Sequence, residues 1–210
     1  MSVMQLARIH RKDTEGVEAK WHIILALLIA TALGLVLSNK LTFDTKYFVA
    51  GLEILLILIL VVVPLHRAFK RLLAIFLLGL ISAANILSLV LVMSALFGGI
   101  TIDGHQLLIS SVAIYLTNII VFGLWYWELD NTKQIRPDFL FPQQTNEKID
   151  PGWKPTFFDY LYISVTNATA FSPTDTLPLT HRGKLLMGIQ SVVSLITVAL
   201  VVARAVNILS

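Results

Sequence analysis

Three polar side chains lie within long hydrophobic stretches of the chain, where a polar group is costly and is therefore a functional candidate. Glu53 comes early in the second stretch, Asn85 lies midway along the third, and Asn118 lies midway along the fourth. A buried acid must pair, take up a proton or face water, so Glu53 could bind a proton or a solute, and the two asparagines could extend a polar path. Alternatively, Glu53 reaches the outer interface. The two asparagines can instead only join helices by hydrogen bonds, and we favour this interpretation for both of them.

The remaining reactive side chains form no catalytic constellation. The chain has no cysteine, which excludes disulfides, thiolate metal sites and cysteine nucleophiles. Its five histidines are scattered without metal-ligand spacing, and there is no Ser/His/Asp arrangement, Gly-rich phosphate loop or zinc pattern. We therefore predict a protein that is not an enzyme and that binds no metal and no organic cofactor.

The elements that must position these residues are hydrophobic helices. Of the 210 residues, 56% are hydrophobic and 14% are charged, against roughly 25% charged in soluble domains. Apolar stretches near the length of about 20 residues that crosses a bilayer cover residues 21–38, 47–65, 72–97, 107–127 and 184–209. Backbone groups in lipid must be paired internally, and the sequence does not alternate as barrel strands do. The prediction is an all-α membrane protein with about five transmembrane helices.

One domain with four regions is expected. They are a cytoplasmic tail or surface helix (1–20), four transmembrane helices (21–127), a proline-containing loop on the membrane surface (128–156), and a pore-like segment with the last transmembrane helix (157–210). Lys and Arg are frequent before the first stretch and between the second and third, and absent from residues 98–106. This bias predicts a multi-pass protein of the cell (inner) membrane with a cytoplasmic N-terminus. The basic residues are not clustered with base-stacking aromatics, so the lipid bilayer and not nucleic acid is the expected partner.

The C-terminal region begins with FFDYLYISVTNATAF, which is too short and too polar to cross a bilayer. SPTDTLPLT and HRGK follow, and then a full apolar helix. This order predicts a re-entrant half-helix and loop, because irregular backbone at membrane depth must be buried in protein or line a wet cavity. Pro173 and Pro178 help to hold the turn, and Thr180 is the expected N-cap of the last helix.

The same region, about a quarter of the chain, resembles the pore module of potassium channels. Thr166 and Thr169 take pore-helix positions, Asp175 takes the place of the filter aspartate, and the stretch after the filter is matched by Pro178, Thr180, Gly183 and Lys184. The chain resembles more closely an uncharacterised family of small bacterial integral membrane proteins that carry NATAFSPTDT and an ARAVNIL ending. These resemblances imply a channel-like protein.

The filter itself departs from the potassium-channel pattern. Where that family has Gly-Tyr-Gly, this chain has Ser172, Pro173 and Thr174, which do not permit the same backbone, so potassium-selective geometry should be absent. The charge bias also places this loop on the cytoplasmic side, whereas the family's pore loop enters from outside. Either one of these two inferences is wrong or the loop is not a working pore of that kind.

Three functions remain open from the sequence. The leading expectation is a channel-like homo-oligomer in which Thr169, Ser172, Thr174 and Asp175 line a constriction that favours monovalent cations. The second is a non-conducting scaffold or partner subunit, in which the loop is a packed plug. The third is a small proton-coupled transporter that uses Glu53 and the intramembrane asparagines.

Overall fold

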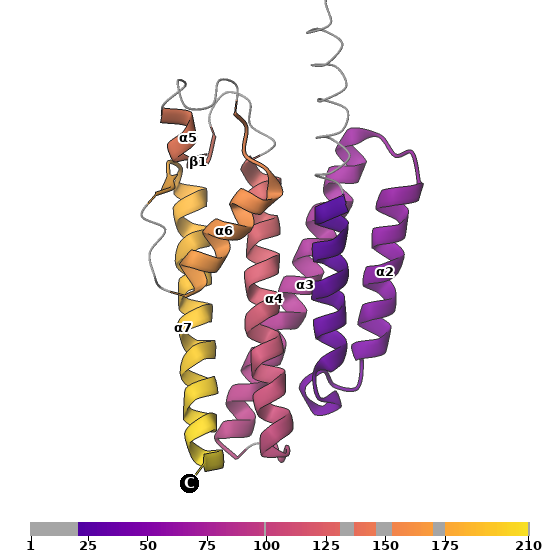
Figure 1. The fold of residues 1–210 in the computed structure, drawn as a ribbon. Helices are drawn as coiled ribbons and strands as arrows, with labels where there is room; N and C mark the ends of the chain where they lie inside the picture. The colour runs from indigo at the N-terminus through magenta and orange to yellow at the C-terminus, as the bar shows by residue number, and fades with distance from the viewer. Residues whose placement is uncertain (1–20, 99, 131–136, 146–152, 170–174, 210) are drawn as a thin grey trace, which may run out of the picture.

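The computed structural model describes residues 21–98, 100–130, 137–145, 153–169 and 175–209, and this part of the chain is almost entirely helical (Figure 1). Its helices are the first helix Trp21–Val36, the 3-10 turn η1 Asn39–Leu41, α2 Lys46–Val62, α3 Arg67–Leu96, α4 Gly104–Asp130, α5 Pro142–Thr145, α6 Phe157–Ala168 and α7 His181–Leu209. Strands β1 Phe139–Leu140 and β2 Leu177–Pro178 form one short antiparallel pair, with Phe139 opposite Pro178.

Among the described residues, three helices are long and apolar enough to cross a membrane, which suggests a membrane protein. They are α3 with 30 residues, α4 with 27, and the part of α7 from His181 to Ala203. The helix α2 has 17 residues, and the first helix is also shorter than the about 20 residues that a crossing needs. The all-helical prediction therefore holds, but length and composition support only three of the five predicted spans.

The outward faces of these helices are apolar. Large hydrophobic side chains are exposed along α2, α3 and α7, for example Phe48, Phe76 and Leu195. A surface of this kind would promote aggregation in water, whereas lipid chains can cover it. The exposed residues therefore agree with the composition in indicating a lipid environment.

The helix α4 lies at the centre of the bundle. It packs against α3 on one side and against α6 and α7 on the other (Figure 1). Buried side chains surround its axis and join all three hydrophobic clusters of the described residues, through Leu124, Ile114 and Phe122. A helix that is apolar on all sides is expected to be buried, and α4 is the helix that positions the others.

Side-chain caps fix where the helices begin. The Asp103 carboxylate accepts hydrogen bonds from the backbone N–H groups of His105 and Gln106 at 3.1 and 3.2 Å, so α4 starts earlier than the predicted residue 107. The Thr180 hydroxyl accepts from the N–H of Gly183 at 3.2 Å, which confirms the predicted N-cap of α7. Both caps satisfy N–H groups that have no partner within the helix.

The short helix α6 runs antiparallel to α4. The Tyr160 hydroxyl meets Asp130 at the end of α4, and Ser164 donates to the carbonyl of Ile119 at 2.6 Å. Ile119 lies eleven residues before Asp130, so α6 runs from the end of α4 toward its middle. The pairing of β2 with β1 then brings the chain back to the end at which it entered.

Candidate functional site

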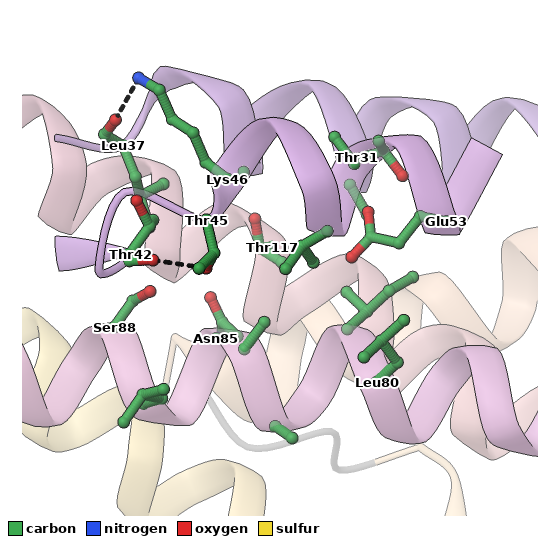
Figure 2. Close-up of a pocket in the computed structure, with 18 of the residues that line it drawn as sticks. Thr31, Leu37, Thr42, Thr45, Lys46, Glu53, Leu80, Asn85, Ser88 and Thr117 are labelled. Carbon is green, nitrogen blue, oxygen red and sulfur yellow. Dashed lines mark hydrogen bonds between the residues drawn. The ribbon is translucent and has the colours of Figure 1, made fainter. Parts of the chain in front are cut away.

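A cavity of about 270 Å³ lies between the first helix, α2, α3 and α4. Its polar lining comes from those four helices and from the turn before α2: Thr31, Thr42, Thr45, Lys46, Glu53, Asn85, Ser88 and Thr117 (Figure 2). Apolar side chains such as Leu80 and Ile81 form most of the remaining wall. The cavity therefore combines an apolar body with a few polar groups, which is the usual composition of a small-molecule site.

Glu53 is the acid of this cavity. It sits two turns inside α2 and is 5% exposed, and its carboxylate lies beside Thr31 (Figure 2). Within the described residues Glu53 makes no ion pair, whereas Glu128, which is also buried, pairs with Arg71 at 3.6 Å. A carboxyl group buried without a cationic partner must hold a proton or bind a cation from outside the protein.

Two buried hydroxyl groups of the lining have spare hydrogen-bonding capacity. Within the described part of the chain Thr117 Oγ1 makes no hydrogen bond, and the Thr31 hydroxyl has only the Glu53 carboxyl beside it. Buried polar groups are nearly always hydrogen-bonded in native proteins. The cavity wall thus offers unused hydrogen-bonding capacity on the same side as Glu53.

The segment between the first helix and α2 forms one end of the cavity. Lys46 donates to the carbonyl of Leu37 at 2.9 Å and points away from Glu53 (Figure 2). The turn contains two successive left-handed residues, Phe43 with φ 48° and Asp44 with φ 60°, a conformation that is costly for a bulky side chain. From α3, Ser88 donates to the carbonyl of Leu41 at 3.0 Å and anchors this turn.

The structure separates the three intramembrane polar residues of the sequence. Glu53 and Asn85 line the cavity, but Asn118 does not. The Asn118 side chain instead donates to Ser194 of α7 at 2.8 Å. Adjacent residues on a helix point about 100° apart, so Thr117 faces the cavity while Asn118 faces α7. One polar path through all three is therefore not formed.

The three pore-like residues that the structure describes, Thr166, Thr169 and Asp175, do not line this cavity. The hydroxyls of Thr166 and Thr169 donate to carbonyls of their own helix, at 2.9 Å to Tyr162 and 2.9 Å to Val165. Asp175 is exposed, next to a shallow depression bordered by Leu140 and Leu177. The remaining predicted residues, Ser172, Pro173 and Thr174, lie outside the described residues.

A polar core between α4, α6 and α7 was missed by the sequence analysis. Gln190 is fully buried and donates to the carbonyl and the hydroxyl of Ser164 at 3.0 and 2.7 Å. Its carbonyl accepts from Tyr126 and from Asn167. The signal was present, because Gln190, Ser194 and Thr197 recur at helical spacing along α7, and all three are buried. This core holds α6 between its neighbours.

A second polar cluster fixes the end at which α6 begins. Asp130 accepts from the backbone N–H of Asp138 and from the Tyr160 hydroxyl, and Thr180 donates to Asp138. Burial, and then the neighbouring Asp130 carboxylate, raise the pKa of Tyr160, so this hydroxyl stays protonated and remains a donor. The cluster joins the end of α4, the residue before β1, α6 and the residue before α7.

No metal site is formed by the described residues, since no three His, Cys, Asp or Glu side chains gather in them. Comparison of the chain with protein-family models, with curated proteins and with solved structures finds no match in any of the three.

Proposed function

We propose that this chain is a membrane transport protein that binds a small solute or a proton at Glu53. The observation that carries the proposal is the burial of one carboxyl group, without an ion pair in the described residues, in a cavity shared by four helices. Ionisable groups in membrane segments usually mark the path of a substrate or proton. This is the third function that the sequence left open, and the cavity favours it over the channel.

The proposal includes the five-span arrangement. The first helix and α2 run alongside α3 and line the cavity with it (Figure 1), so we infer that they cross the membrane as well. With the N-terminus on the cytoplasmic side of the cell (inner) membrane, the turn at residues 39–45 lies on the outer side of that membrane. Solute would then reach Glu53 from the outer side, past Lys46.

Proton-driven uptake into proteoliposomes tests this function. With a pH-sensitive dye inside and an imposed membrane potential, amino acids, amines and sugars are added in turn. We expect one class to produce a protein-dependent, saturable change of internal pH. The Glu53→Gln variant should abolish it, because the amide can neither carry a proton nor balance a positive charge. Glu128→Gln is the matched control, since Glu128 is buried and lies outside the cavity.

A channel-like pore is the second candidate, and the path of α6 favours it. A half-length helix that enters and leaves beside α4 is the arrangement that a re-entrant pore segment would have. Several copies around one axis would be needed. The same liposomes separate the two candidates: a pore would pass K⁺ or Na⁺ without saturation, independently of Glu53 and in a manner sensitive to Asp175→Asn. Liposomes that show neither response would leave the non-conducting scaffold.

A further inference from the structure

The cavity contains two ionisable side chains, and they lie at different depths. Lys46 and Glu53 are seven residues apart on α2, which is about 10 Å along the axis. The Lys46 ammonium is held at the end formed by the turn before α2, by the Leu37 carbonyl and by the ring of Tyr47, 5.3 Å from its centroid. Among the described residues, the inner part of the cavity therefore has one negative group and no positive group. Such a site attracts a cation and repels an anion.

The other polar groups around Glu53 can accept hydrogen bonds. Thr31 and Thr117 each place a buried hydroxyl on the cavity wall. In the described residues that of Thr117 has no partner and that of Thr31 lies against Glu53. Asn85 adds an amide (Figure 2). An ammonium group has three N–H donors and no acceptor. One carboxylate and two hydroxyl oxygens match that number of donors.

The rest of the cavity wall limits the polarity and the size of the uncharged part of the ligand. Leu80, Ile81 and Ala84 are apolar, so they favour a short hydrocarbon over a sugar. A cavity of about 270 Å³ has the volume of about nine water molecules at ~30 Å³ each. A hard divalent cation fits poorly, because it requires six or more oxygen ligands in most sites and the cavity supplies a single carboxylate.

We propose that the Glu53 cavity takes a small primary alkylammonium ion, with its charged nitrogen between Glu53, Thr31 and Thr117 and its carbon chain against Leu80 and Ile81. The inference rests on the proposed function and names the class of solute for that site. The charge of the ligand replaces the missing ion-pair partner of Glu53, and its N–H groups satisfy the two threonine hydroxyls.

Binding to the purified chain in detergent tests the ligand class. The probes are n-butylammonium, the uncharged n-butanol and tetramethylammonium, which is charged but has no N–H group. Calorimetry and the midpoint of thermal unfolding are measured for each. We expect n-butylammonium to bind at least about tenfold more tightly than either of the others. Glu53→Gln should remove that preference, and Glu128→Gln should keep it.

A second variant keeps the proposal testable if the Glu53→Gln protein does not fold. Thr117→Val keeps the shape of the side chain and removes the hydroxyl, so it should weaken n-butylammonium binding severalfold and leave n-butanol binding unchanged. Equal binding of n-butanol and n-butylammonium by the native chain would overturn the cationic ligand and leave a solute-binding cavity. Equal binding of tetramethylammonium would overturn the N–H contacts. The proposed function fails by a different result, the absence of any Glu53-dependent response in the liposomes.

Discussion

Two acids buried in the same bundle have different neighbours. Glu128 lies near the end of α4, where the long side chain of Arg71 reaches it from α3. Glu53 lies deeper, where the nearby groups are hydroxyls and apolar side chains. An arginine can extend along an apolar surface to keep its charge near water, which is possible at the helix end and not beside Glu53. Position along the helix therefore makes Glu128 a structural group and Glu53 a candidate binding group.

Of the residues outside the cavity, Gln190 is the one whose replacement we expect to lower the free energy of unfolding the most. In Gln190→Leu, Tyr126 and Asn167 lose an acceptor and Ser164 loses a donor. Each buried polar group left without a partner costs about 1–3 kcal/mol, and hydrogen bonds within membranes average nearer 0.6 kcal/mol. We expect the midpoint of thermal unfolding, followed by tryptophan fluorescence, to fall by several degrees.

Val192→Leu is the control for this substitution. Val192 lies on the exposed face of α7, only two residues away, so added apolar volume there should change the midpoint little. Equal effects of the two substitutions would show that the polar core does not hold α6 and α7 together.

The helix α6 depends on the absence of a side chain on α4. A Cβ atom added to Gly123 would lie 3.2 Å from the Cα of Leu161 and 3.3 Å from its Cδ1. The first of these is a backbone atom, so α6 itself would have to move. Small residues at such crossings let helices approach closely, and here Gly123 lets a half-length helix pack beside α4.

Gly123→Leu should therefore displace α6 and destabilise the fold. Overpacking of this kind costs roughly 1–3 kcal/mol, and the midpoint of unfolding should drop accordingly. Gly188→Ala in α7 is the matched control, because an added Cβ there meets nothing within 4 Å and alanine favours a helix over glycine by about 1 kcal/mol. A stable Gly123→Leu protein with unchanged Trp fluorescence would contradict the close contact.

The two candidate sites occupy opposite sides of the central helices. The first helix, α2, α3 and α4 line the cavity, and no described side chain of α6 or α7 contributes to it. The polar core that positions α6 lies instead between α4 and α7. A mutation in the cavity should consequently abolish solute binding without displacing α6. The liposome assay therefore compares Glu53→Gln with Asp175→Asn.

The arrangement predicts which connections share a side of the membrane. Lys40 of η1 donates to the carbonyl of Thr101 at 2.6 Å, so these two connections lie at one end of the bundle. Because the chain has no cysteine, single cysteines can report on each end. We expect an impermeant maleimide to label Asn39→Cys and Phe97→Cys from outside intact cells, and Ala68→Cys and Gln143→Cys only after lysis. Labelling of Asn39 and Gln143 from the same side would contradict the five-span topology.

The sequence alone was sufficient for the helical class, the approximate bounds of the long helices and the start of α7 at Thr180. These features depend on local properties, namely the length of apolar runs and the capping chemistry of single residues. The sequence also singled out Glu53 and Asn85, because a polar residue in an apolar run is conspicuous wherever it finally points.

Only the tertiary structure decided which polar residues meet. Asn118 and Thr117 are neighbours in the chain, yet one contacts Ser194 and the other lines the cavity. The residues that hold α6, such as Tyr126 and Gln190, are 64 positions apart. Contacts of this kind depend on the rotation of each helix about its axis and on the closeness of its neighbours, which Gly123 sets for α4 and α6. Apolar periodicity fixes that a helix forms, whereas packing between helices fixes the direction in which each polar side chain points.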